Sequence, residues 1–308
     1  MCKSNLRQST NLIYGSYIAF FACVVLISSG AIAQSIPDNE VSAFELAQLT
    51  VQPGEQVSGE IPVSSGTASD PEASFIPVTI THGPKPGPVL ALIAGIHGSE
   101  YAPIMAMQGL PELIDPASLS GTLIVVHVAN LPAFQGRTIY FGPGDLKNLN
   151  RAFPGVADGT ITERIAYTLT QQVMMRSDYL IDIHAGDGNE KLRPSYSAYY
   201  AEAGGETVVQ ESRRIAVAFG LDTIVQFAGS YDSAEDAIYT SAQAVTLGIP
   251  AMDVESGELA RTDGAYVDPI IAGVLSVLRE LNMIAGEPDL PPNPLFISVR
   301  ARVYSEHN

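Results

Sequence analysis

The sequence predicts an α/β fold in which a mixed, mostly parallel sheet is flanked by helices. The first observation is a set of short apolar runs, each suited to a strand buried on both faces of a sheet. These runs cover residues 88–95, 122–128, 179–183, 222–227 and 249–254. The second observation is a set of helical patterns between the runs, at about 100–114, 161–176, 206–219 and 268–284. Strands that alternate with helices favour a largely parallel sheet.

Two of the predicted helices carry signals for their ends. Thr160 and Glu163 form a Thr-x-x-Glu capping box before the 161–176 pattern. Gly220 directly follows the 206–219 pattern, where a glycine commonly ends a helix. In contrast, residues 34–75 are polar and rich in Ser, Gly and Pro, and we expect mainly loops there.

The first 33 residues have the pattern of a secretory signal peptide. Lys3 and Arg7 form a positive start, residues 17–29 are an apolar run, and residues 31–33 supply small side chains for cleavage. The uninterrupted apolar run is shorter than the ~20 residues that a membrane-spanning helix needs, so cleavage is favoured over a membrane anchor. We therefore expect an exported protein, periplasmic or secreted, with no membrane attachment after signal cleavage.

Composition excludes several classes of protein. The chain has 16 Lys and Arg against 33 Asp and Glu, and a formal net charge of −17 repels nucleic acid. Its hydrophobic content of 46% is too high for a disordered chain. Cys2 and Cys23 are the only cysteines and both lie in the predicted signal peptide, so the mature chain must be stabilised by its core or by a metal.

Histidine and carboxylate residues follow the predicted strands, at the sheet edge where α/β proteins bind ligands. His97 and Glu100 are three residues apart where the 88–95 run turns into a helix, and His184 ends the 179–183 run. Two imidazoles and a carboxylate form a catalytic zinc set that leaves a position open for water. Asp182 is predicted on the same strand face as His184 and could orient an imidazole.

The alternative interpretation is that these residues bind nothing. A single His-x-x-Glu is a common pattern, and a lone strand-end histidine is more often a buried structural residue than a ligand. His127, within an apolar run, is interpreted as structural. However, two histidines lie at strand ends and one of them has a glutamate three residues later, and this combination favours a metal.

Longer motifs occur in one order along residues 77–257. They are His97-Gly-Ser-Glu100, Arg137, Asn148-Leu-Asn-Arg-Ala-Phe-Pro-Gly155, Asp182-Ile-His184 and Glu255-Ser-Gly257. This series resembles the succinylglutamate desuccinylase/aspartoacylase family, zinc amidohydrolases related to the zinc carboxypeptidases. The resemblance implies a zinc carboxypeptidase-like fold, one Zn²⁺ per chain held by His97, Glu100 and His184, and hydrolysis of an N-acyl amide bond.

The resemblance also implies roles for residues around the metal. Glu255 is the expected general base, accepting a proton from water and delivering it to the leaving amine. Arg137 is expected to stabilise the oxyanion. Asn150 and Arg151 are expected to bind a substrate carboxylate, because a guanidinium pairs well with that group. Arg137, Lys147 and Arg151 lie close in sequence with a single Asp145, which favours a small anionic substrate.

The C-terminal part departs from the family pattern. Family members generally continue into a small β-rich region, whereas here a Pro-rich stretch at 287–294 leads to one predicted strand within 295–303. The expected organisation is a signal peptide at 1–33, a zinc-dependent α/β hydrolase domain at 34–286, and a linker with a truncated strand at 287–308.

Three functions fit these observations. The leading one is hydrolysis of the amide of an N-acyl amino acid or a similar small carboxylate-bearing substrate. The second is a zinc carboxypeptidase that acts on peptides or cell-wall peptides, which would need the same zinc, base and carboxylate-binding residues. The third is a non-catalytic exported binding protein, and the presence of the complete residue set argues against it.

Overall fold

The computed structural model describes residues 41–63, 73–191 and 195–299. The predicted signal peptide at 1–33 and the end of the predicted C-terminal segment at 300–308 lie outside these ranges. Within the described ranges, no helix combines the length and the apolar character needed to cross a membrane.

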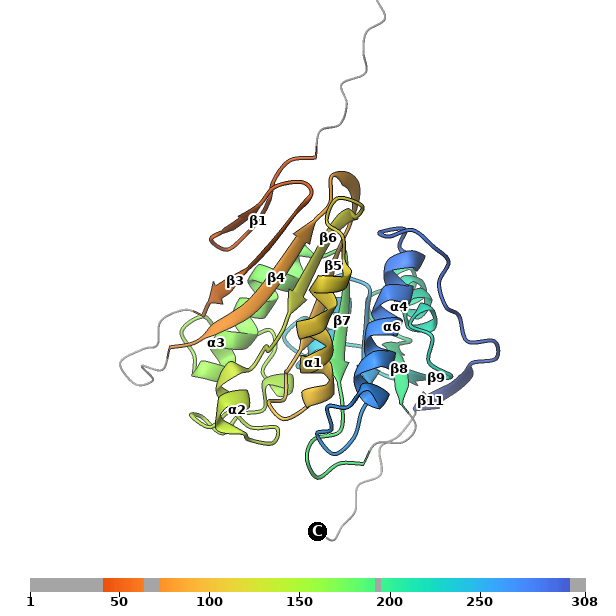
Figure 1. Ribbon diagram of the computed structural model, residues 1–308. Coiled ribbons are helices and arrows are strands. Elements are labelled where there is room, and N and C mark those ends of the chain that lie inside the picture. Colours follow the sequence, from red (N-terminus) through yellow and green to blue (C-terminus); the bar gives the residue numbers. More distant parts are fainter. Residues whose placement is uncertain (1–40, 64–72, 192–194, 300–308) are drawn as a thin grey trace, which may run out of the picture. The chain divides into compact units, whose positions relative to one another are not determined.

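A nine-stranded sheet forms the centre of the domain, in the order β11-β9-β8-β10-β7-β5-β6-β4-β3 (Figure 1). The middle strands β10, β7, β5 and β6 are parallel, while β8, β4 and β3 each form an antiparallel pair. This arrangement confirms the predicted mixed, mostly parallel sheet. The strand bounds are β3 Glu55–Pro62, β4 Phe75–His82, β5 Lys85–Ala94, β6 Ser120–Val126, β7 Tyr179–His184, β8 Tyr196–Tyr200, β9 Thr223–Phe227, β10 Ala251–Glu255 and β11 Leu295–Val299.

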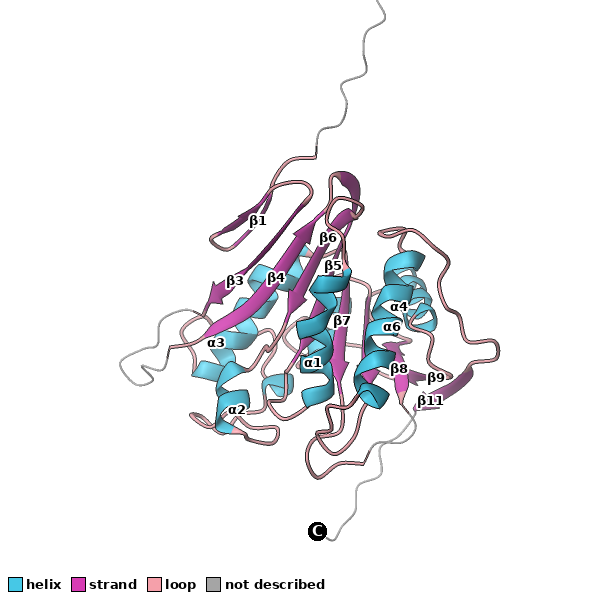
Figure 2. Cartoon of the chain, viewed as in Figure 1, coloured by secondary structure: helices cyan, strands magenta, loops and turns pink. Residues whose placement is uncertain are grey.

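Helices cover both faces of this sheet (Figure 2). One face packs against α1 (Tyr101–Gly109), α4 (Glu206–Ala218) and α6 (Gly264–Glu280). The other face packs against α3 (Ile161–Thr168) and α5 (Thr240–Thr246). The remaining elements are α2 (Leu131–Gly136), the turns η1 (Leu110–Leu113), η2 (Leu149–Arg151), η3 (Leu169–Val173) and η4 (Met174–Arg176), and a hairpin of β1 (Phe44–Leu46) and β2 (Leu49–Val51).

The central strands fill a core on each side of the sheet. In β5, Ala91 and Ile93 face the α3 and α5 side, whereas Leu90 and Leu92 face the α1, α4 and α6 side. All four side chains are fully buried. Because both faces of these strands are covered, their sequences are continuous apolar runs, and this is why the sequence predicts them.

The predicted helix ends are also confirmed. The Thr160 backbone amide donates to Glu163 Oε2 at 2.9 Å, and both halves of the capping box are present at the start of α3. Gly220 follows α4 with a φ of +88°, a left-handed conformation that favours glycine.

The expectation of loops at 34–75 was wrong for β1, β2 and β3. The reason is that β3 is an edge strand with many exposed side chains, so its sequence is polar rather than an apolar run. The strand predicted within 295–303 corresponds to β11, which extends the main sheet in parallel beside β9.

Gly273 allows α6 to pack closely on Phe219, and its substitution should destabilise the fold. A Cβ at residue 273 would lie 2.4 Å from the buried ring of Phe219. We expect Gly273→Ala to lower the free energy of unfolding by about 1–3 kcal/mol in urea denaturation. A Cβ at Gly109 in α1 would meet nothing within 4 Å. Gly109→Ala is therefore the control and should raise the free energy of unfolding by up to about 1 kcal/mol. Equal effects of the two substitutions would contradict the close packing of α6 on Phe219.

Candidate metal centre and active site

Two neighbouring parallel strands bring three candidate metal ligands together. After β5 ends at Ala94, the chain turns and enters α1, with His97 in the turn and Glu100 as the residue that precedes the helix. His184 is the last residue of β7, which pairs directly with β5. The ligands therefore meet at the carboxyl edge of the sheet, as the sequence predicts.

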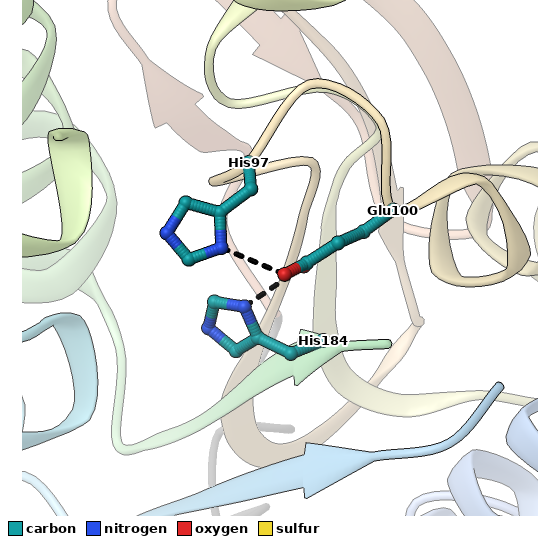
Figure 3. A group of neighbouring side chains, drawn as sticks. All are labelled: His97, Glu100 and His184. Atoms are coloured by element: carbon teal, nitrogen blue, oxygen red, sulfur yellow. Dashed lines mark hydrogen bonds and ion pairs between the residues drawn. The ribbon is translucent and has the colours of Figure 1, made fainter. Parts of the chain in front are cut away.

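The two histidines both point toward the carboxylate of Glu100 (Figure 3). His97 Nδ1 donates to Glu100 Oε1 at 2.7 Å, and His184 Nδ1 donates to Glu100 Oε2 at 2.9 Å. The three residues are only 8%, 3% and 3% exposed, respectively. One donor atom from each lies within 4.8 Å of the other two. Two imidazole nitrogens and a carboxylate in this arrangement fit the ligand preference of zinc.

The electrostatics of the group favour a positive charge. Burial alone would raise the pKa of Glu100, but the attraction of His184 and His97 outweighs it and lowers the pKa to about 2. Burial alone would lower the pKa of His184, but Asp182 and Glu100 hold that pKa well above its usual value. A divalent cation would supply the same positive charge without the histidine proton, so the residues fit a metal on charge as well as on ligand type.

Gly98 explains how this turn can pack so closely beneath α2. A Cβ at residue 98 would lie 2.3 Å from the carbonyl carbon of Ala133 and 2.3 Å from the backbone nitrogen of Phe134. These are main-chain atoms in the first part of α2, and they cannot move aside as a flexible side chain would. The backbone between His97 and Glu100 is therefore held against α2, which limits the movement of both candidate ligands.

The register of β7 and β10 adds two carboxylates beside the candidate ligands. Asp182 pairs with Asp253 and His184 pairs with Glu255, so the four side chains share one face of the sheet. Asp182 Oδ2 lies 2.9 Å from His184 Nε2, where it can orient the imidazole. Glu255 Oε2 is buried and has no hydrogen-bond partner among the described residues. Burial, with the charges of Glu100 and Asp253, outweighs the attraction of His184 and raises the pKa of Glu255 to about 8.

Several residues around the ligands were not predicted from the sequence as part of this site. Asn148 Oδ1 accepts a hydrogen bond from His97 Nε2 at 3.2 Å, which fixes the second nitrogen of that ring. The Tyr140 ring packs edge-on against His97, with centroids 5.5 Å apart. Ser99 donates to the buried Asp187, and burial raises the pKa of Asp187 to about 6. These contacts join residues far apart in sequence, so the sequence does not predict them. Asn148 alone among these residues lies within a motif that the sequence analysis quotes for the family.

The three cations that lie close in sequence have different neighbours in the structure. Arg137 follows α2 and lines a cavity of about 600 Å³ beside α1, and within the described residues it makes no hydrogen bond or ion pair with the candidate ligands. Lys147 Nζ pairs with Glu163 Oε1 at 2.5 Å. Arg151 Cζ lies 4.3 Å from the ring centroid of Tyr239. Proximity in sequence therefore does not produce a single cationic pocket formed by these three side chains.

Asn150 connects the turn η2 to the start of α5. Its Oδ1 accepts from the Thr240 backbone amide at 2.9 Å and from the Thr240 hydroxyl at 3.1 Å. The neighbouring Arg151 donates from Nη1 to the Asn150 carbonyl oxygen at 2.6 Å. The predicted carboxylate-binding pair is thus held next to α5, and the Asn150 oxygen is already occupied by a structural interaction.

Comparisons with known proteins agree with this geometry. Residues 86–281 match the model of the succinylglutamate desuccinylase/aspartoacylase catalytic domain. N-alpha-acetyl-L-2,4-diaminobutyric acid deacetylase of Halomonas elongata is 40% identical over 115 residues, which is 37% of this chain and 33% of that protein.

Solved structures share the fold. A succinylglutamate desuccinylase from Silicibacter sp. TM1040 has a TM-score of 0.73 and 24% identity, with 88% of this chain and 79% of that chain covered. The product-bound ectoine utilization protein EutE (DoeB) of Ruegeria pomeroyi has a TM-score of 0.69 and 22% identity, with 85% and 76% covered.

Removal of the Asn150 acceptor should weaken the attachment of α5. The Thr240 amide is buried, and leaving it without an acceptor costs about 1–3 kcal/mol. We expect Asn150→Ala to lower the free energy of unfolding by that amount in urea denaturation, whereas Asn150→Asp keeps an acceptor oxygen and should lower it less. Equal losses for the two variants would show that the hydrogen bonds to Thr240 contribute nothing to stability.

Proposed function

This chain belongs to the succinylglutamate desuccinylase/aspartoacylase family, and we propose that it is a zinc-dependent deacylase that hydrolyses the amide bond of an N-acyl amino acid. The observation that carries the proposal is the convergence of His97, Glu100 and His184 beside Glu255 at one edge of the sheet. The family is one of deacylases that act on N-acyl amino acids, and the geometry supports this chemistry in the present chain.

In this proposal the metal is bound by His97, Glu100 and His184. Asp182 and Asn148 lie against the outer nitrogens of the two rings and keep Nδ1 of each directed inward. A zinc ion held there would supply Lewis-acid chemistry toward an amide carbonyl and a water molecule. The open side of such a three-ligand set leaves room for both.

Glu255 is the proposed general base and then the general acid. It lies beside His184 in the sheet, and its Oε2 has no partner among the described residues that would compete for a proton. Burial and neighbouring carboxylates raise its pKa, whereas a cation bound nearby would lower it, so the carboxylate form could accept a proton from a water molecule and the resulting acid could release it to the leaving amine nitrogen. The amide bond then breaks to give a carboxylic acid and a free amino acid.

Arg137 is proposed to stabilise the oxyanion, and Arg151 is proposed to bind the substrate carboxylate. The guanidinium of Arg137 has no hydrogen bond or ion pair within the described part of the chain, which leaves it able to turn toward a ligand. Arg151 lies on the ring of Tyr239 and donates from Nη1 to the Asn150 carbonyl oxygen, and its other guanidinium nitrogens have no hydrogen-bond partner among the described residues. Asn150 positions this arginine, since its own oxygen is bound to Thr240.

The proposed substrate is a small N-acyl amino acid. The relative from Halomonas elongata, by its name, removes the acetyl group of N-acetyl diaminobutyric acid, and this supports a small amino acid over a peptide. We also propose that the protein is exported, either to the periplasm or outside the cell, because of the signal-peptide pattern at residues 1–33.

The metal proposal predicts about one zinc per purified chain, as for a single catalytic site. His97→Ala and His184→Ala should each lose the metal, because two ligands hold zinc far more weakly than three. His127→Ala is the control, since His127 bonds Thr79 and Met107 rather than the candidate ligands. Elemental analysis after dialysis measures the outcome. A wild-type chain that stays free of metal after zinc has been supplied would refute the proposed site.

The proton-transfer role predicts that Glu255→Gln lowers kcat on N-acetyl amino acids by about 10²-fold or more, because the amide cannot accept the proton. Zinc content should stay at the wild-type level. Glu287→Gln, an exposed carboxylate beyond α6, is the control and should leave kcat unchanged. Full activity of Glu255→Gln would rule out Glu255 as the base. If the wild-type protein released C-terminal residues from peptides in preference to deacylating N-acetyl amino acids, the carboxypeptidase function would be favoured instead.

A further inference from the structure

The cavity of about 600 Å³ beside α1 has an extended wall. Four of its lining residues, Tyr101, Ile104, Met105 and Gln108, belong to this helix. Their spacing puts them on one side of the helix, since residues three and four positions apart are neighbours there. Seven residues of α-helix span about 10 Å, so this wall extends along about two helical turns.

Apolar side chains dominate both walls of the cavity. Phe134 of α2 lies in the second wall, and its ring meets the ring of Tyr101 edge-on with centroids 6.1 Å apart. Met105 in the α1 wall is 43% exposed, so a large apolar side chain of this wall is in contact with water. Covering it with apolar atoms of a ligand would be favourable. The cavity therefore suits an apolar group of extended shape.

A single guanidinium belongs to this cavity. Arg137 ends α2 in a left-handed backbone conformation with a φ of +54°, and its amide donates to the Phe134 carbonyl oxygen at 3.2 Å. Its guanidinium has no partner within the described part of the chain, and no Asp or Glu is among the described residues that line the cavity. An apolar cavity with one free cation fits a ligand that has an apolar chain and one end that carries negatively charged oxygen.

The walls of the cavity are built on the segments that form the metal centre. Tyr101 directly follows the candidate ligand Glu100. The backbone nitrogen of Phe134 packs on Gly98, where a Cβ would lie only 2.3 Å away from it. Thr262 lines the cavity from the loop that follows β10, the strand that ends at the proposed base. The cavity and the reacting groups therefore share the same supporting backbone.

We infer that this cavity binds the acyl chain of the substrate, so that the substrates are amino acids whose N-acyl group is an unbranched apolar chain longer than acetyl. This inference rests on the proposed deacylase function. In that function Arg137 stabilises the oxyanion on the acyl carbonyl, and the acyl chain is bonded to the same carbonyl carbon. Hydrolysis releases this chain as a carboxylate, which can pair with the same guanidinium.

The size and lining of the cavity distinguish between acyl groups. An acetyl group would fill only a small part of the volume, whereas an extended octanoyl chain is about as long as two helical turns. Each further methylene that leaves water strengthens binding by up to about fourfold. An acyl chain that ends in a carboxylate would place its charge among Ile104, Met105 and Phe134, where it loses hydration without a second cation.

The kinetic test compares two substrates that differ only in the acyl chain, N-octanoyl-L-alanine and N-acetyl-L-alanine. We expect the wild-type protein to have at least about tenfold higher kcat/KM for the octanoyl substrate. Met105→Gln keeps the length of the side chain but makes it polar, and it should lower this preference at least about fivefold. Met105→Leu remains apolar and should keep most of the preference.

Met175→Gln is the matched control. Met175 is 58% exposed in η4 and does not line the cavity, so its substitution should leave the preference between the two substrates unchanged. Hydrolysis of N-acetyl-L-alanine as fast as N-octanoyl-L-alanine, or equal preferences in Met105→Gln and Met175→Gln, would overturn the inference while the deacylase function stands.

A binding measurement separates this inference from the catalytic proposal. Titration calorimetry with sodium octanoate and sodium acetate requires no turnover, and both ligands carry the same carboxylate. We expect octanoate to bind at least about tenfold more tightly, and Met105→Gln but not Met175→Gln to reduce the difference. Selective octanoate binding without hydrolysis of any N-acyl amino acid would refute the deacylase function and keep the acyl-chain site. Equal binding of both ligands, or binding of neither, would refute the acyl-chain site.

Discussion

The in-register parallel pairing of β7 and β10 is the constraint on which the candidate site depends. It sets His184 beside Glu255 and Asp182 beside Asp253, and it directs all four side chains to the face covered by α3 and α5. A shift of one residue in either strand would turn that strand's acidic and histidine side chains into the apolar core under α1, α4 and α6. Core packing therefore enforces the geometry of the site, since Ile181, Ile183, Met252 and Val254 fill that opposite core.

Burial of its charged groups makes this site costly in folding free energy. Glu100, Asp182 and the imidazole of His184 are almost inaccessible to solvent, in a chain that already has a net charge of −17. Buried carboxylates remain ionised only where positive charge or donors compensate for lost hydration. In the described structure the two histidines supply much of that compensation for Glu100, which is why its pKa falls while that of Glu255 rises. The positive charge of a bound ligand would thus add to the stability of the folded chain.

Much of the fold could be predicted because the central strands are buried on both sides and the helix ends carry local signals. The candidate ligands could be predicted because each follows a strand, and the carboxyl ends of parallel strands meet at one edge. The edge strand β3 was missed because its solvent-exposed face removes the apolar run. The partners Asn148, Asp187 and Asp253 depend on contacts between distant segments, and the separate surroundings of Arg137, Lys147 and Arg151 show that closeness in sequence does not predict a shared pocket.

The first turn of α5 joins two parts of the candidate site. Its consecutive residues Thr240 and Ser241 bind Asn150 and Asp253, respectively, and adjacent residues of a helix keep a nearly fixed separation. The turn η2 and the strand β10 are therefore linked through one helix. A displacement of α5 would move both ends of this link together, so that a change at Asn150 would be transmitted to the strand that carries Glu255 through the backbone of a single turn.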